Sequence, residues 1–542
     1  MLPEEYVIKS NALFTANEHE PHPGYVYVEG NEIVEVGTLE ELEEHPRVGV
    51  KVIDVGDNLV MPGFNDAHMH FALASVQHDP DYCVDLLFAE SERACLDRVR
   101  DFDETHPGDG WIYGWGWYSA VWDNPIDPSK EGLDSLGIDR PICLDDFSMH
   151  VAWLNSKALE MVGITKNTPD PEGGIIRRDD EGNPTGILCE PAATDIANNV
   201  VLNVPDLKAS LLKSMKRLNS LGITSVGDMH PLGVANEGVY ETYQQIADND
   251  EATLRISFFP DMTDVEAAKA ERAKHHGDMV RCGGLKLISD EAVEAYTAYM
   301  AEPYLNAPEG PGYRGECVYS QDELDEIVDR AVAAGFNPRI HAIGDGAASM
   351  ILNSYEKALA KYGRKGTRYC IEHGDNFKAE DIERLADLNG CFAIQPQHPI
   401  GGFPEGLYPI ILGKERTSHM WRYREMLDGG ITLGLSTDWP AVMSINPIDT
   451  VYAAVTRSDF KGNPPEGYYR NNALTLGEAL QSHTQGSAYI EGFESRIGTL
   501  EEGKLADIVV LDCNPFELDI MDLRKASVAM TIFNGRVVYE KN

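Results

Sequence analysis

Residues 320–345 read SQDELDEIVDRAVAAGFNPRIHAIGD, and this stretch decides the fold. Ser320, with Glu323 three residues later, forms a capping box in which the Glu323 side chain reaches back to the Ser320 N–H. The pattern predicts a helix that ends at Gly335, a residue type that is common just after a helix. The segment NPRIHAIGD that follows predicts a strand with His341 near its end.

The same order of helix and strand continues towards the C-terminus. Predicted strands are TRYCIEHGD, CFAIQPQ and ITLGLSTDWP, and predicted helices lie near 349–362, 378–390 and 419–429. A second capping box, from Thr475 to Glu478, begins another helix. Regular alternation of this length favours a parallel sheet covered by helices. We therefore predict an α/β fold built on a (β/α)8 TIM-like barrel, rather than an open sheet.

The two ends of the chain share a different pattern, in which apolar and polar positions alternate. Such alternation predicts strands, and Asn534-Gly535 is a strong signal for a two-residue hairpin. We predict a composite β-sandwich domain from residues 1–60 plus 489–542, and a barrel domain over 61–488. Residues at about 75–200 are rich in Trp, Gly and Pro and break the rhythm, which predicts an insertion, or lid, over the barrel mouth.

The composition and the net charge argue against several kinds of partner and location. The formal net charge of −44 gives a surface that repels phosphate backbones and anionic membranes, so we predict neither a nucleic-acid nor a membrane partner. There is no run of about 18 apolar residues, and the first ten residues lack the pattern of a secretory signal. Nine Cys without a CxxC pair indicate a reduced protein. These features predict a cytoplasmic location.

The segment MPGFNDAHMHF, residues 61–71, places His68 and His70 two positions apart. In a strand such residues point to the same face, roughly 6.6 Å apart, so both imidazoles can bind one metal ion. His341, His373 and Asp438 also end predicted strands, where a barrel places its active site. The alternative is that the histidines are ordinary surface or core residues and that Asp438 caps the next helix.

Many ordered motifs also agree with one family. They are PGFNDAHMH, WIYGWGW, HVAWLNSKAL, GNPTGILCE, GLKLISD, HAIGDGA, IEHGDN, STDWP and GTLEEGKLADIVVLD. Their order resembles the amidohydrolase superfamily, specifically the amidohydrolase family 3 branch that is similar to N-substituted formamide deformylases. The resemblance runs nearly from end to end.

The resemblance implies a centre of one or two divalent metal ions, with zinc as the expected metal. His68 and His70 would bind the first ion, with Asp438 close to it. His341 and His373 would bind the second ion.

Lys286, in GGLKLIS, stands where relatives carry a lysine that is carbamylated and bridges two metals. An ammonium group is a poor metal ligand, and carbamylation would turn it into an anionic oxygen ligand. The structural alternative is a lysine whose stem covers apolar surface, and a single metal stays open.

The resemblance also implies a mechanism. A metal-bound hydroxide attacks a carbonyl carbon, and Asp438 carries a proton from the water to the departing amine. His150 matches a family position that faces the substrate and stabilises the oxyanion. Glu190 and Gln397, the latter with His398 beside it, are weaker predictions for substrate contacts, because polar residues near a pocket often make ordinary hydrogen bonds.

One departure from the family bears on the substrate. Relatives have Asp-Gly a few residues after the barrel lysine, whereas this chain has Asp290-Glu291. We predict a hydrolase that cleaves a linear amide-type C–N bond in a small molecule, an N-acyl or N-formyl amine. The alternatives are a cyclic amide, an ester or a deamination on the same scaffold, and a non-catalytic binding or regulatory relative. Relatives are often homo-oligomers, so a second copy of the chain is the remaining candidate partner.

Overall fold

The computed structural model describes residues 4–119, 122, 125–147, 151–171, 174–189, 192–193, 196, 206–229, 238–400 and 406–541. The chain divides into two compact units. Unit 1 comprises Met1–Met69, Met215–His230 and Asn249–Asn542, and unit 2 comprises His70–Ser214 and Pro231–Asp248. Among the described residues, no helix is long and apolar enough to cross a membrane.

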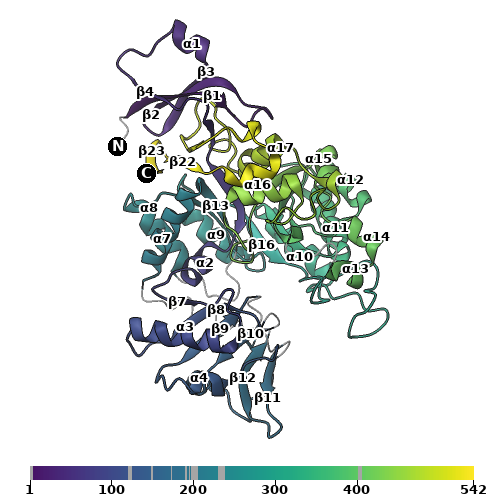
Figure 1. Ribbon diagram of the computed structural model, residues 1–542. Coiled ribbons are helices and arrows are strands. Elements are labelled where there is room, and N and C mark those ends of the chain that lie inside the picture. The colour runs from purple at the N-terminus through teal and green to yellow at the C-terminus, as the bar shows by residue number, and fades with distance from the viewer. Residues whose placement is uncertain are drawn as a thin grey trace. The chain divides into compact units, whose positions relative to one another are not determined.

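Strands from both ends of the chain form one eight-stranded sheet in unit 1, in purple and yellow in Figure 1. Its strands are β1 (Glu5–Leu13), β2 (His22–Glu29), β3 (Glu32–Thr38), β4 (Lys51–Asp54), β5 (Leu59–Pro62), β21 (Ile508–Leu511), β22 (Val528–Phe533) and β23 (Arg536–Glu540). The order is β23-β22-β21-β5-β1-β2-β3, and β4 pairs with β1. Helix α1 (Leu39–Glu44) follows β3. Asn534 and Gly535, both at positive φ, connect β22 to β23 as the hairpin signal predicts.

Parallel strands of unit 1 form two further sheets. The first has the order β15-β14-β13-β6 and the second the order β16-β17-β18-β19-β20. The first consists of β6 (Phe64–Met69), β13 (Ile223–Met229), β14 (Arg255–Phe259) and β15 (Val280–Cys282). The second consists of β16 (Leu285–Ile288), β17 (Pro338–Ala342), β18 (Cys370–His373), β19 (Cys391–Ile394) and β20 (Thr432–Leu435).

Backbone hydrogen bonds link the two parallel sheets to each other in two places. One joins β16 to the residue after β14, and the other joins the segment after β20 to β6. The Lys286 N–H donates to Pro260 O at 2.9 Å, and the Asp438 N–H donates to His68 O at 2.8 Å. The parallel strands and the helices between them fit a TIM-barrel amidohydrolase fold.

The helices of unit 1 follow the predicted alternation. Helix α10 (Gln321–Ala333) begins with the predicted capping box, in which both reciprocal hydrogen bonds are present. The others are α9 (Val265–Lys274), α11 (Asp345–Tyr362), α12 (Ala379–Asp387), α13 (Leu407–Ile411), α14 (Lys414–Ser418), α15 (Tyr423–Asp428), α16 (Pro447–Thr456), α17 (Leu476–Gln481) and α18 (Ser487–Ile490). The short turns are η2 (His398–Ile400), η3 (Arg470–Asn472), η4 (Ser482–Gly486), η5 (Pro515–Glu517) and η6 (Ile520–Lys525). The helix predicted near 419–429 begins later than expected, because Trp421 has a φ of +53° that no α-helix accommodates.

Helix α17 begins with the second predicted capping box, from Thr475 to Glu478. Glu478 also pairs with Arg424, whose Nη1 lies 2.8 Å from Glu478 Oε1. Hydrogen bonding from Arg424 is the main cause that lowers the pKa of Glu478 from 4.5 to about 2.

Because this pKa is lowered in the folded state, the pair stabilises the protein above about pH 4.5 and loses that effect as the pH falls towards 2. We expect Glu478→Gln to lower the free energy of unfolding by about 2 kcal/mol at pH 7, and by much less at pH 3. Gln keeps the capping box, so the comparison isolates the charge. Urea unfolding at the two pH values measures the effect, and equal losses at both would contradict this origin.

Unit 2 has its own six-stranded sheet, which the irregular sequence of the predicted insertion did not indicate. The order is β11-β12-β10-β9-β8-β7. The strands are β7 (Cys83–Asp85), β8 (Ile112–Trp117), β9 (Ile142–Asp146), β10 (Val151–Leu154), β11 (Ile175–Arg178) and β12 (Pro184–Cys189). The helices are α2 (Phe71–Gln77), α3 (Glu92–Thr105), α4 (Lys130–Asp134), α5 (Ser156–Met161) and α8 (Val239–Asp248), and α7 (Leu207–Ser220) includes the boundary between the units.

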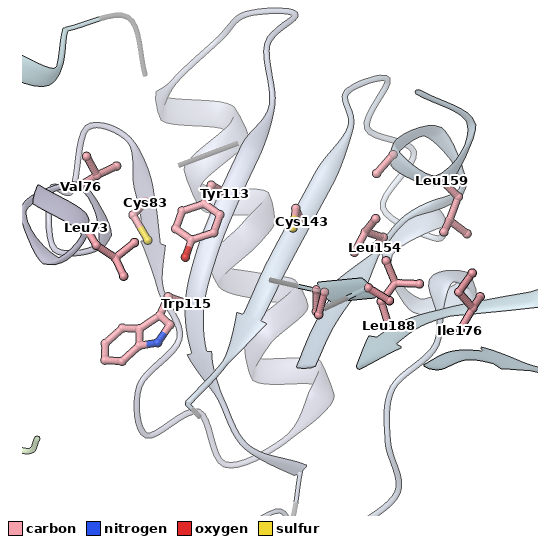
Figure 2. Close-up of a cluster of buried hydrophobic side chains, with 14 residues drawn as sticks. Leu73, Val76, Cys83, Tyr113, Trp115, Cys143, Leu154, Leu159, Ile176 and Leu188 are labelled. Atoms are coloured by element: carbon pink, nitrogen blue, oxygen red, sulfur yellow. The ribbon is translucent and has the colours of Figure 1, made fainter. Parts of the chain in front are cut away.

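Several aromatic residues of the insertion pack inside unit 2. Figure 2 shows Tyr113 and Trp115 of β8 beside Leu73 and Cys83, in a cluster of buried side chains. Trp115 is only 2% exposed. These residues therefore form a core that stabilises the sheet.

Candidate metal centre

The carboxyl ends of the parallel strands carry most of the predicted ligands. His68 lies in β6, His341 in β17 and His373 at the end of β18. Lys286 lies in β16, and Asp438 follows β20. Strands β16, β17 and β18 pair in parallel register, which places their carboxyl ends at one edge. A barrel presents its reactive side chains at this edge.

The structure brings His68, His373 and Asp438 together. One candidate ligand atom from each lies within 4.8 Å of the other two. His68 Nε2 is 3.3 Å from Asp438 Oδ1. The ring centroid of His373 is 4.9 Å from that of His68 and 4.4 Å from that of His341. This spacing suits side chains that share a bound cation.

Burial favours the neutral form of the imidazoles of His68, His341 and His373. Burial, with a further contribution from Lys286, lowers the pKa of His341 to about 3. Burial also holds the pKa of His373 well below its usual range and lowers the pKa of His68. A neutral imidazole has the free lone pair that a metal ion needs.

Three buried nitrogen atoms indicate whether the residues of the site fit a metal ion. Lys286 Nζ, His341 Nε2 and His373 Nδ1 have no hydrogen-bond partner within the described structure. Burial lowers the pKa of Lys286 to about 8, although Glu372 and Asp438 act in the opposite direction. Buried polar atoms without partners are costly, and nitrogen and carboxylate donors are the ligands that zinc takes. The residues therefore fit a divalent metal.

Asp438 adopts a left-handed backbone conformation, with a φ of +63°. Its Oδ1 faces His68, and its Oδ2 lies 3.7 Å from His398 Nε2. His398 begins η2 just after β19, and its ring stacks on His373 with centroids 5.9 Å apart. The structure thus adds His398 to the side chains around Asp438.

The remaining predicted residues have different positions. His70 follows β6 as the N-cap of α2 and belongs to unit 2, so its ligand role stays a prediction. The Gln397 amide nitrogen donates to Ser444 O at 2.7 Å and to Thr450 Oγ1 at 2.9 Å, which ties it to the segment at α16. His150 and Glu190 lie outside the described residues.

Sequence reasoning did not select Glu372, which contacts His68, or Arg339, which contacts Glu372. Glu372 Oε2 is 2.5 Å from His68 Nδ1, and Glu372 Oε1 is 2.6 Å from Arg339 Nε. Burial opposes ionisation of Glu372, but Arg339 and His68 outweigh it and hold its pKa well below the usual range. The sequence did carry one signal for this pair. The predicted strands RIHA and CIEH contain Arg339 and Glu372, two residues of opposite charge.

Asp290, which directly precedes the departure from the relatives at Glu291, has a clear structural role. Its carboxylate accepts backbone N–H groups from Ile343 at 3.0 Å, Gly344 at 2.8 Å and Tyr299 at 2.9 Å. These bonds fasten the loop after β16 to the segment after β17. Glu291 beside it is exposed, so the Gly-to-Glu difference leaves this anchor unchanged.

Residues 51–539 match the sequence profile of the amidohydrolase family. The chain belongs to this family. As an amidohydrolase, the protein is an enzyme that acts on carbon–nitrogen bonds. Membership of the family and the donor set described above support a divalent metal at the site.

Similar proteins agree with this assignment. The chain is 29% identical to the amidohydrolase YtcJ of Bacillus subtilis over 98% of each chain. It is 28% identical to the N-substituted formamide deformylase of Arthrobacter pascens over 95% of each chain. A metal-dependent hydrolase of Pyrococcus horikoshii shares the fold, with a TM-score of 0.77, 24% identity and coverage of 95% of this amidohydrolase and 99% of that chain.

Proposed function

We propose that this amidohydrolase cleaves a linear amide-type C–N bond of a small molecule, an N-acyl or N-formyl amine. The observation that carries the proposal is the convergence of His68, His373 and Asp438 within 4.8 Å, beside buried nitrogen atoms that lack partners. The name of the deformylase relative supports an N-formyl amine as one member of the substrate class.

The proposed metal is zinc, as one or two ions, because the donors are imidazoles and carboxylates. The residues that would hold it are His68, His70, Lys286, His341, His373 and Asp438, with Lys286 as its carbamate. The unpaired, buried Lys286 Nζ supports the carbamate, since a carbamate would end its isolation. When bound, the metal would acidify water and polarise a carbonyl group.

The protein's own groups would move the proton. Asp438 accepts the proton of the attacking water as the new C–O bond forms, and it returns that proton to the amine nitrogen as the C–N bond breaks. His398 Nε2 lies near the second carboxylate oxygen of Asp438, at 3.7 Å. His150 is proposed to stabilise the oxyanion, and Glu190 to orient the substrate.

The proposed scaffold is a closed barrel in which the sheet ending at β6 and the sheet ending at β20 complete one cylinder. The bond from the Asp438 N–H to His68 O supports closure at the metal centre itself. The terminal strands would form the composite β-sandwich beside this cylinder, and residues at about 75–200 would form the lid.

A substrate panel tests the function. Zinc-loaded protein is offered N-formyl and N-acyl amines, a cyclic amide, an ester and an amino heterocycle, and release of amine, acid or ammonia is followed. We expect kcat/KM for a linear amide to exceed that for any other class by at least about tenfold, which corresponds to about 1.4 kcal/mol. Preference for another class would reassign the substrate. No turnover by metal-loaded protein would favour a binding or regulatory role.

A further inference from the structure

We propose that Glu372 and Arg339 form a clamp that fixes the orientation of His68 and thereby sets the metal affinity of the centre. This inference rests on the proposed function in one respect only, namely that His68 binds a metal. Neither residue touches the reacting atoms, so both are positioning residues.

The clamp is a continuous set of buried contacts. His68 Nδ1 lies 2.5 Å from Glu372 Oε2. Arg339 donates from Nε to Glu372 Oε1 at 2.6 Å and from Nη2 to Glu372 Oε2 at 3.0 Å. The side chain of His68 is 1% exposed, and those of Glu372 and Arg339 are 0% exposed. Water therefore cannot replace any of these partners.

The carboxylate determines which nitrogen of His68 carries the proton. An ionised Glu372 can only accept a hydrogen bond, so His68 Nδ1 must be the N–H that donates to it. The lone pair then lies on Nε2, the atom that is 3.3 Å from Asp438 Oδ1. A metal-binding imidazole whose other nitrogen donates to a carboxylate has a fixed ring orientation and a more basic ligand atom.

Arg339 ties the clamp to the strand that carries His68. Its Nη2 also donates to the carbonyl oxygen of Ala67, the residue before His68, at 2.8 Å. Its guanidinium carbon lies 4.3 Å from the ring centroid of Phe259 in β14. Arg339, in β17, therefore holds the His68 side chain indirectly, through Glu372 in β18. It also holds the backbone of β6 directly, at the residue before His68. A lysine could not make the same bidentate contact.

The alternative is that the pair only stabilises the barrel. The chain offers a matched pair for comparison, in which Arg255 Nε lies 2.6 Å from Asp507 Oδ2 and Nη2 lies 2.9 Å from Oδ1. The Arg255 and Asp507 side chains are equally buried, at 1% and 4% exposed. Neither is a proposed ligand, so neutralising Asp507 costs a buried charge pair without touching the centre.

The experiment measures zinc affinity by competition with a chromogenic chelator, without any substrate, in Glu372→Gln, Arg339→Lys and the control Asp507→Asn. We expect zinc binding to weaken by about 10- to 100-fold in Glu372→Gln and by a smaller factor in Arg339→Lys. Asp507→Asn is expected to bind zinc as the wild type does. The absorption spectrum of the cobalt-substituted protein should change only in the two clamp variants.

Each outcome either supports or overturns the proposed clamp. Unchanged affinity and an unchanged cobalt spectrum in both clamp variants would overturn the proposal, as would an equal loss of affinity in Asp507→Asn. If Glu372→Gln fails to fold because it leaves Arg339 unpaired, Arg339→Lys, which keeps the charge, decides alone. A wild-type protein that binds no divalent metal would instead refute the proposed function.

Discussion

Asp438→Asn is expected to lower kcat by at least about a thousandfold while the fold and most of the metal binding remain. The amide has nearly the shape of the carboxylate but cannot take up the proton of the attacking water. Asn is also the residue type best suited to this backbone, because Asp438 has a φ of +63°, a region that Asn enters readily. Loss of activity therefore reports the lost proton carrier rather than strain.

Steady-state kinetics of the variant measure the fall in kcat, and circular dichroism measures whether its fold is retained. Asp428→Asn is the matched control, because Asp428 is an exposed carboxylate at the end of α15, with its side chain 65% exposed. The control should keep wild-type turnover. Near-wild-type turnover in Asp438→Asn would exclude the proposed proton carrier.

Thorough removal of metal is expected to abolish turnover, to below about 1% of the loaded enzyme, and to lower the melting temperature. Three buried nitrogen atoms of Lys286, His341 and His373 would be left without a partner, which destabilises the folded state. Zinc should restore both properties. Magnesium should not, because it prefers oxygen ligands.

This prediction is checked by chelating the metal and then measuring the activity and the melting temperature of the protein. His341→Ala should bind metal more weakly than the wild type, whereas the matched control His419→Ala should not, since His419 is exposed at the end of α14. A fully active enzyme after metal removal, confirmed by elemental analysis, would rule out a metal mechanism.

Many of the helices and strands around the two parallel sheets were predictable because their signals are local. The capping boxes at Ser320 and Thr475 depend on contacts over three residues, and both are present in the structure. The strand ends at His341 and His373 follow from short apolar segments between helices. By contrast, the helix expected near 419–429 begins only at Tyr423, because Trp421 has a φ of +53° that propensity does not reveal.

The candidate site shows the same division. Gln397 and His398 are neighbours in sequence with similar polarity, yet only His398 approaches Asp438, while Gln397 bonds to Ser444 and Thr450. Which neighbour faces the centre depends on the turn after β19. No periodicity in CFAIQPQ indicates that turn.

By itself, the sequence determined the order of helices and strands, the hairpin at Asn534-Gly535 and the family, because these depend on neighbouring residues or on motif order. Only the tertiary structure decided that Glu372 meets His68, 304 positions away in the chain. The physical reason is that a buried carboxylate needs a partner, and the packing of the parallel strands against one another determines which strand supplies it.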